Sequence, residues 1–466
     1  MSQRTFSMPL QAVTIFAVTF VVFVSSPVYI FGDSHFTLLL SHNILRHGQI
    51  RLDEYLERPI DPRLLRHRPT TRIYQVATIN GHNYYVYPVG SSVLSIPFIP
   101  VMNALGLSPV RADGGYDVDG ELAMQRLLAS GLMAVLAGVF FLMARQILSS
   151  SWSMVIALGG ALGTQVWSTA SRVLWSHTWG LVLLGLVLLL LVSADRRHTR
   201  VNPLLLASLL AWMYFVRPVH SVAIVTVSLY IVLNTYNWKS FTCYVCTGTA
   251  WLLAFVAYSY HSFGTVLPRY YLQRGFILGA RLDVLKAYVL RAAGHLASPS
   301  RGLLVYLPIV LFVAYLLVRY RRTLPSVPLT LLAVANVICL GVVVSGFGPW
   351  WGGHSYGPRL LTEVVPWLVL LAIMGVGGML RERAGSTERS HRRHRLELAV
   401  GAVLLILSVA IHARGALAWD TVLWNYFPID VDRRPQRVWD WRDAQFLAGA
   451  LTPLGSDAEM YDPRRR

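Results

Sequence analysis

Apolar runs of about 20 residues recur along the whole chain and alternate with short polar segments. A helix of roughly 20 apolar residues is long enough to cross the hydrocarbon core of a bilayer. The pattern therefore predicts an all-α integral membrane protein with about 11 transmembrane helices. The first covers 13–30, and the others cover 124–144, 153–171, 174–193, 203–217, 219–235, 241–260, 302–318, 327–346, 360–380 and 396–413.

Two segments near the N-terminus depart from this pattern. Residues 31–123 predict a long external loop, because Ser34–Tyr87 is polar and contains no run that could span a membrane. Within it, Ser34–Arg46 has apolar residues at helical spacing, which predicts an amphipathic helix lying on the membrane surface. Val93–Leu107 is apolar but short and contains two prolines, so we expect a re-entrant or interfacial segment there.

Basic residues at the ends of the predicted spans set the orientation. Cytoplasmic loops of membrane proteins carry an excess of Lys and Arg. This rule places the N-terminus inside, together with Arg145, Arg196, Arg197, Arg200, Lys239, Arg319, Arg321, Arg322 and the cluster Arg381–Arg395. No small-residue cleavage pattern follows the first apolar run, so we expect a retained helix. The organisation predicted is a transmembrane domain over 1–413 and an external, aromatic-rich tail over 414–466.

Composition and charge narrow the protein class. Hydrophobic residues make up 55% of the chain and charged residues only 14%, with a mean hydropathy of +0.49, which excludes a soluble enzyme with one large core. The net charge of +18 does not indicate nucleic-acid binding, because the basic residues lie at the ends of apolar segments. The three cysteines lack histidine or acidic neighbours at ligand spacing, so neither a disulfide framework nor a zinc site is predicted. We expect a multi-pass protein of the inner or plasma membrane.

Several short motifs carry a resemblance to a known family. Asp33 follows the first helix directly, an amphipathic segment comes next, and Tyr87-Pro88-Val89-Gly90 leads into the following apolar segment. Two further stretches, Ser298–Pro308 and Gly348–Arg359, look like segments of uncharacterised bacterial members of that family. In this arrangement the chain resembles the GT-C membrane glycosyltransferases, which include protein O-mannosyltransferases and the aminoarabinose and arabinosyl transferases.

The resemblance implies an inverting transferase that moves a sugar from a polyprenyl-phosphate donor to a lipid, glycan or protein acceptor at the external membrane face. Asp33 matches the family's first-loop catalytic acid by position, and a carboxylate there can take the proton of an acceptor hydroxyl. Some relatives carry two adjacent acids, or an acid with a metal, whereas Asp33 is followed by Ser34. No metal ligands are therefore assigned, and a divalent cation, Mg²⁺ or Mn²⁺, stays an alternative.

The donor's leaving group would be a lipid phosphate, which needs cations or hydrogen-bond donors. Arg359, beside a glycine-rich turn, is the first choice, followed by Arg301 and Arg217, with His354 and Tyr356 as further donors. Each arginine is equally well explained as an anchor at the membrane interface.

Aromatic side chains are candidates for stacking on sugar rings. Those selected are Tyr87, Trp350, Trp351, Trp439 and Trp441. Tryptophans also mark membrane boundaries, and the tail either contacts the acceptor or caps the external loops. A second acid assisting Asp33 would be Asp53 or Glu54, although the alternating charges around them favour a solvated surface.

Two other functions stay open at this point. A lipid-linked-sugar transporter or flippase would line its passage with Arg217 and Arg359, and a noncatalytic scaffold would bind polyprenyl lipids without needing Asp33. The long first loop and the absence of an internal sequence repeat argue against a transporter. The sequence does not identify the sugar or the acceptor.

Overall fold

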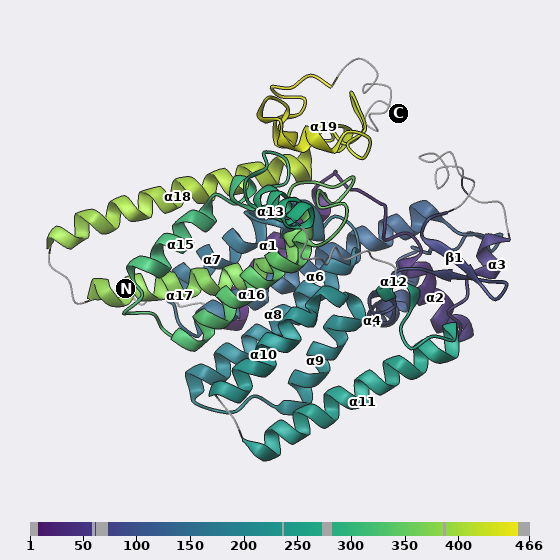
Figure 1. Cartoon of the computed structure of the whole chain (residues 1–466), viewed down its shortest axis with the longest axis horizontal. Helices are drawn as coiled ribbons and strands as arrows, with labels where there is room; N and C mark the ends of the chain where they lie inside the picture. Colours follow the sequence, from purple (N-terminus) through teal and green to yellow (C-terminus); the bar gives the residue numbers. More distant parts are fainter. Residues whose placement is uncertain are drawn as a thin grey trace.

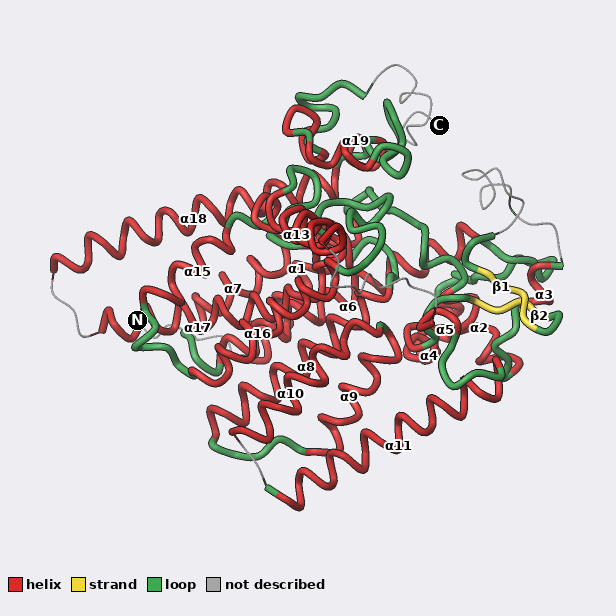
Figure 2. The backbone as a smooth tube through the Cα atoms, viewed as in Figure 1, coloured by secondary structure: helices red, strands yellow, loops and turns green. Residues whose placement is uncertain are grey.

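The computed structural model describes residues 8–57, 61, 73–234, 237–272, 282–384 and 388–454. Helices dominate it, and the described part holds one two-stranded sheet (Figures 1 and 2). The predicted all-α class is therefore confirmed. Seven helical segments are long and apolar enough to cross a membrane, namely Met8–Ser25, Val118–Arg145, Ser176–Arg197, Trp238–Phe263, Val327–Ser345, Arg359–Arg383 and Arg393–Leu417.

The other four predicted spans form shorter helices, so an eleven-span count does not follow from helix length. They are α7 (Ser150–Leu162), α9 (Pro203–Val216), α10 (Ser221–Asn234) and α15 (Ile309–Arg319). Proline explains one of the breaks. The span predicted at 302–318 divides into α14 (Leu303–Tyr306) and α15 at Pro308, which has no N–H to continue a helix and clashes with the preceding turn.

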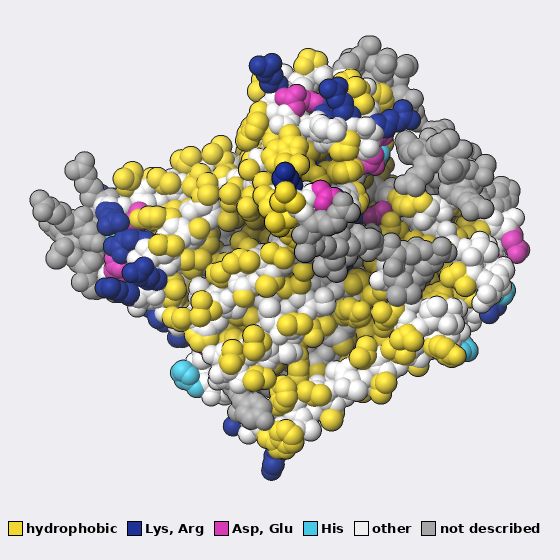
Figure 3. All heavy atoms as spheres, viewed as in Figure 1, with side chains coloured by type: hydrophobic (Ala, Val, Ile, Leu, Met, Phe, Trp, Pro, Cys, Tyr) yellow, Lys and Arg dark blue, Asp and Glu magenta, His cyan; other side chains and the backbone are white. Residues whose placement is uncertain are grey.

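The long helices differ in how deeply they lie in the bundle. Their bounds are α1 Met8–Ser25, α6 Val118–Arg145, α8 Ser176–Arg197, α11 Trp238–Phe263, α16 Val327–Ser345, α17 Val365–Ala384 and α18 Glu388–Leu417. The apolar windows of α6 and α8 are 72% buried, and that of α17 with the preceding turn is 89% buried, whereas those of α1, α11 and α18 are 17%, 6% and 22% buried. The first group forms the core, and the second presents apolar side chains outward, as a lipid-facing surface requires. Apolar side chains cover much of the face seen in Figure 3.

Polar side chains begin and end several helices. Asp117 accepts a hydrogen bond from the Gly120 N–H at the start of α6, and Asn202 and Asn237 cap α9 and α11 in the same way. Arginines occupy the last turns of α8, α15 and α17. Residues 385–387 of the predicted basic cluster Arg381–Arg395 lie outside the described residues.

The first loop folds into a small subdomain at one end of the bundle (Figure 1). It contains α2 (Thr37–His47), α3 (Asp53–Leu56) and the antiparallel hairpin β1 (Val76–Ile79) and β2 (His82–Tyr85), which pairs Val76 with Tyr85. The amphipathic helix predicted at 34–46 is present as α2. Its apolar residues Leu39 and Leu40 pack with Tyr55 and Tyr85 of the loop, so the apolar face serves packing within the protein. Residues 58–60 and 62–72 lie outside the described part.

The remaining elements are short and connect the long helices. The apolar segment 93–107 breaks at its prolines into α4 (Gly90–Ser95), η2 (Ile96–Phe98) and α5 (Ile99–Ala104). The other connecting elements are η3 (Val166–Ala170), η4 (Pro218–His220), α12 (Arg269–Leu272), α13 (Leu282–Ala297) and η5 (Arg359–Val364). The tail folds over the end of α18 as α19 (Asp420–Leu423), η6 (Pro435–Trp439), η7 (Trp441–Asp443) and η8 (Gln445–Leu447), and residues 455–466 are not described.

Candidate functional site

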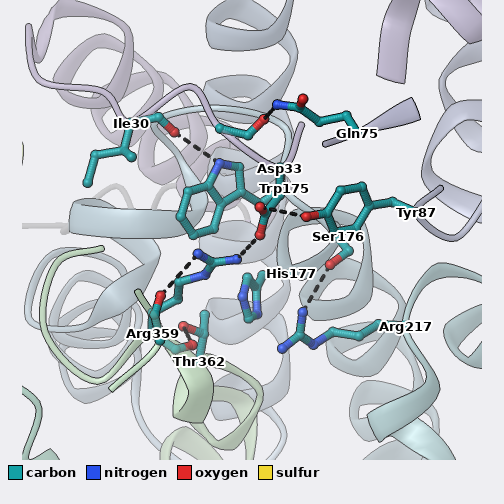
Figure 4. A network of polar contacts seen from close by, with 12 residues as sticks. Ile30, Asp33, Gln75, Tyr87, Trp175, Ser176, His177, Arg217, Arg359 and Thr362 are labelled. Atoms are coloured by element: carbon teal, nitrogen blue, oxygen red, sulfur yellow. Dashed lines mark hydrogen bonds and ion pairs between the residues drawn. The ribbon is translucent and has the colours of Figure 1, made fainter. Parts of the chain in front are cut away.

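One small pocket collects predicted site residues from distant parts of the chain. Its lining includes Asp33 from the segment after α1, Tyr87 from the segment after β2, Arg217 from the end of α9 and Arg359 from the start of η5. Trp175, just before α8, forms another wall, and Figure 4 shows these side chains turned toward one another. The structure thus brings together the predicted acid, two of the three predicted arginines and one of the predicted aromatic residues.

Two arginines hold the end of α1, from which the Asp33 segment continues. Arg172 donates hydrogen bonds to the carbonyl oxygens of Ser26, at 2.7 Å, and Phe23, and Arg126 donates to Ser26 at 3.1 Å. The last carbonyls of a helix have no partner within the helix and carry a partial negative charge, so cations stabilise this end. The backbone leading to Asp33 is therefore fixed.

The start of α6 fixes the chain on the other side of Asp33. The buried Glu121 carboxylate accepts from the backbone N–H groups of Phe36, at 2.9 Å, and Leu38, at 2.6 Å. One helical turn later, the Gln125 side chain donates to the Ser34 carbonyl at 2.7 Å and accepts from the Leu174 N–H at 3.1 Å. Because Leu174 precedes Trp175, α6 holds both the acid and the indole in place.

A glycine brings the hairpin segment against Arg217. A Cβ atom added to Gly90 would lie 2.5 Å from the backbone carbonyl carbon of Phe215, two residues before Arg217. Only a residue without a side chain allows this approach of two backbones. The glycine of Tyr87-Pro88-Val89-Gly90 therefore has a physical reason: it lets Tyr87 and Arg217 share the pocket.

Asp33 is surrounded by hydrogen-bond donors. The Tyr87 hydroxyl donates to Asp33 Oδ1 at 2.7 Å, the Tyr85 hydroxyl donates to the Asp33 carbonyl at 2.7 Å, and Arg359 forms an ion pair with Asp33 Oδ2. Burial raises the pKa of Tyr87 well above its ordinary value, and the negative charge of Asp33 raises it further. The Tyr87 hydroxyl therefore stays protonated and remains a donor at neutral pH.

Arg359 forms part of the pocket wall. Its guanidinium carbon lies 3.5 Å from the centre of the Trp175 ring, and the Trp175 Nε1 donates to the Ile30 carbonyl at 3.1 Å, which holds the ring (Figure 4). The pocket volume is ≈ 30 Å³, enough for about one water molecule. The Arg359–Asp33 ion pair therefore occupies the space that a larger ligand would need next to the carboxylate.

Beneath the pocket lies a buried charge group that the sequence analysis missed. Arg217 Nε lies 2.7 Å from Glu363 Oε1, His177 Nδ1 lies 2.6 Å from the same oxygen, and Arg217 Nη1 donates to the Ser176 hydroxyl at 3.1 Å. Glu363 is four residues after Arg359, so one turn of chain carries both groups. The available signal was an acidic residue inside a predicted span, which is costly unless paired and marks a functional position.

Arg301, the third predicted arginine, does not line this pocket. It is 1% exposed and donates to Gln445 Oε1 at 2.5 Å, to the Trp351 carbonyl at 2.6 Å and to Asn425 Oδ1 at 3.1 Å. Burial lowers its pKa to about 10, so it keeps its charge at neutral pH. Its contacts join the bundle to the C-terminal tail.

The other predicted binding residues also lie outside the lining of the Asp33 pocket. Tyr356 donates to the Ile411 carbonyl at 2.6 Å, Trp350 packs against Trp439 with ring centres 5.7 Å apart, and Trp351 Nε1 donates to Asp432 Oδ1 at 2.8 Å. Trp441 is 62% exposed on the tail surface. Trp350, Trp351 and Trp439 therefore join the bundle to the tail, whereas Tyr356 packs on α18.

His354 belongs to the same tail contact. Its Nε2 lies 3.1 Å from Asp430 Oδ1 and 3.9 Å from Asp432 Oδ2. This is a group of described residues whose ligand atoms lie close enough to hold a metal ion, and it is separate from the residues lining the Asp33 pocket. Burial alone would raise the pKa of Asp430, but hydrogen bonds from His354 and from the Asp432 backbone outweigh it and lower that pKa.

The predicted second acid has a structural role. Asp53 accepts from the Asn83 backbone N–H at 2.6 Å and pairs with His82 at 2.8 Å. Partial burial opposes these contacts, but they lower the pKa of Asp53. The carboxylate therefore fastens α3 to strand β2, and neither Asp53 nor its neighbour Glu54 lines the Asp33 pocket.

Comparison with known proteins does not assign this chain to a family. No family model matches the chain, and no curated protein sequence matches it either.

Proposed function

We propose that this chain is a GT-C-type membrane glycosyltransferase, which moves a sugar from a polyprenyl-phosphate donor to an envelope acceptor at the external membrane face. One observation carries the proposal. Four segments that are far apart in sequence place a carboxylate, a tyrosine hydroxyl and two guanidinium groups around one pocket at an end of the helical bundle. That set matches the chemical needs of sugar transfer from a lipid phosphate.

In the proposed reaction, Asp33 is the general base. The acceptor hydroxyl oxygen attacks the anomeric carbon of the donor sugar, the bond from that carbon to the phosphate oxygen breaks, and the lipid phosphate leaves with the bonding electrons. Asp33 takes the proton of the attacking hydroxyl. Attack from the face opposite the leaving group inverts the anomeric configuration. The Tyr87 hydrogen bond orients the carboxylate for this step.

Arg359 connects donor binding to activation of the base. In the closed pocket its guanidinium neutralises Asp33. A donor phosphate is a bidentate acceptor that competes for the guanidinium, and its arrival would release the carboxylate to take a proton. Arg217 is the second phosphate ligand, and its ion pair with the buried Glu363 keeps it extended toward the pocket. These two cations supply positive charge that a divalent ion would otherwise provide.

The proposed topology has eleven spans. It uses the seven long apolar helices together with α7, α9, α10 and the α14–α15 segment, each of which coincides with a predicted span. The N-terminus is then cytoplasmic, and the Asp33 pocket and the tail lie outside.

The test is sugar transfer by the purified full-length protein. The assay would use radiolabelled polyprenyl-phosphate sugars carrying mannose, glucose, arabinose or aminoarabinose, with envelope extract as the acceptor. Asp33→Asn should lower transfer about 10²–10⁴-fold while donor binding survives. Asp119→Asn, at an exposed position in the first turn of α6, is the matched control and should be as active as wild type.

Donor binding without turnover by either protein would contradict the transferase and favour a transporter or scaffold. Full turnover by Asp33→Asn would keep the enzyme and remove Asp33 as its base.

A further inference from the structure

A second, larger cavity adjoins the Asp33 pocket. Its volume is ≈ 410 Å³, within the roughly 300–1,000 Å³ typical of ligand pockets. The hairpin of the first loop forms one wall, and the end of α11 with α12 forms the other. These elements lie near one another at the same end of the bundle (Figure 1). Tyrosine is the commonest residue in its lining, and the described lining residues carry no charged side chain.

The two cavities share walls. Tyr85, Tyr87, Pro88 and Tyr270 line both. Because Tyr87 also donates to Asp33 at 2.7 Å, a molecule held in the larger cavity lies one tyrosine away from the proposed base. An acceptor hydroxyl at this junction would meet the carboxylate.

Aromatic rings follow the cavity from its far end to the Asp33 pocket. Tyr84 and Tyr258 each pack edge-to-face on Phe263, with ring centres 5.3 and 5.9 Å apart. Nearer to Asp33, Tyr270 lies 5.5 Å from Tyr87. Tyrosine offers both a broad apolar ring and a polar edge. Pyranose rings have the complementary form, with an apolar face of C–H groups and a rim of hydroxyls.

We propose that this cavity binds the acceptor and that the acceptor is a neutral oligosaccharide. The inference deepens the proposed function and rests on it, since it names the acceptor class of the same site. Among the described residues the lining is uncharged, which does not suit an anionic lipid head group or a charged peptide, because each buried charge would need a partner. An isoprenoid tail would gain nothing from the tyrosine hydroxyls, and aliphatic residues would bind it equally well.

The test uses saturation-transfer NMR on the full-length protein in detergent, with maltose, cellobiose, lactose and α-1,2-mannobiose as probes and farnesol as a competitor. At least one disaccharide should bind, and farnesol should not displace it. Tyr258→Leu should weaken that binding at least 10-fold and raise the acceptor KM by a similar factor without changing the donor KM. Tyr258→Phe, which keeps the ring, should retain most of the affinity.

Tyr260→Leu is the matched control, because Tyr260 lies two residues further along α11, is 66% exposed and does not line the cavity. It should bind like wild type. If Tyr258→Leu fails gel filtration, Tyr84→Leu tests the opposite wall.

Three results would overturn the inference. The first is disaccharide binding that survives in Tyr258→Leu, and the second is displacement of the disaccharide by farnesol. The third is a protein that transfers sugar normally but binds no disaccharide. The last of these leaves the transferase standing. Disaccharide binding without any transfer would instead contradict the proposed function and leave a carbohydrate site.

Discussion

Arg359 and Arg301 occupy similar surroundings in the sequence but different surroundings in the fold. Arg301 directly precedes Gly302, and Arg359 follows Gly357 by two residues. Each guanidinium carbon also lies over a tryptophan, 3.5 Å from the Trp175 ring centre for Arg359 and 5.5 Å from the Trp424 ring centre for Arg301. Arg301 is fully enclosed by protein acceptors at the tail. Arg359 lines a pocket, and its main partner is the Asp33 carboxylate.

The difference separates a structural arginine from one that can bind an anion. A guanidinium whose donors are all committed to buried oxygens cannot turn to a ligand without leaving those oxygens unsatisfied. A guanidinium that is paired with one carboxylate at a pocket can exchange that carboxylate for a phosphate. The following substitutions test this contrast.

The largest effect is expected from Arg359→Leu. Sugar transfer should fall about 10²–10³-fold, because a preorganised donor to the leaving phosphate is lost. The melting temperature in detergent should hardly change, since the side chain borders a cavity. A large loss of folding stability with normal transfer would reverse the roles that we assign to Arg359 and Arg301.

Arg301→Leu should do the opposite. It leaves several buried oxygens without a donor, at about 1–3 kcal/mol each, so the free energy of unfolding should fall by about 3 kcal/mol. The measurements are thermal unfolding and proteolysis of the tail, and donor affinity per folded molecule should match wild type. A stable Arg301→Leu protein that cannot bind donor would contradict the structural role.

Gly90→Ala tests how the pocket is assembled. The added methyl group collides with the Phe215 backbone, and overpacking of this kind costs about 1–3 kcal/mol. The substitution should lower stability and also reduce transfer, because it separates Tyr87 from Arg217. Gly248→Ala is the control, since a Cβ there meets no atom within 4 Å among the described residues. Equal behaviour of the two variants would show that the close approach at Gly90 is dispensable.

The smallest effect concerns the tail and pH. The folded pKa of Asp430 is lowered from 3.8, so its contribution to stability is complete above pH 3.8 and is lost as the pH falls through the lowered value. Asp430→Asn should therefore reduce tail stability by less than about 1 kcal/mol at neutral pH, because the pair with His354 is partly exposed. Tail proteolysis measured from pH 3 to 7 should show weaker acid sensitivity in the variant, and an unchanged profile would exclude this contact as the cause.

The helical class and most helix positions could be predicted from the amino-acid pattern alone. Runs of apolar residues reveal a membrane-spanning helix without knowledge of its neighbours, because the bilayer imposes the requirement along each segment separately. The sequence also contains the signal for the helix break at Pro308, because a proline inside the span predicted at 302–318 interrupts helical hydrogen bonding. Asp33 and Arg359 were selected from local sequence and a family resemblance, and the fold brings them into one pocket.

The roles of the polar residues depend on the three-dimensional fold. Arg217 and Arg301 look alike in sequence, and their partners, Glu363 and Gln445, are more than 140 residues away from them. Likewise, the apolar face of α2 fits a membrane surface or a protein interior equally well, and only contact with the hairpin settles which one it meets. The local pattern of apolar and polar residues indicates whether a segment needs an apolar or an aqueous environment. The partner of a buried charge instead depends on which distant segments fold together.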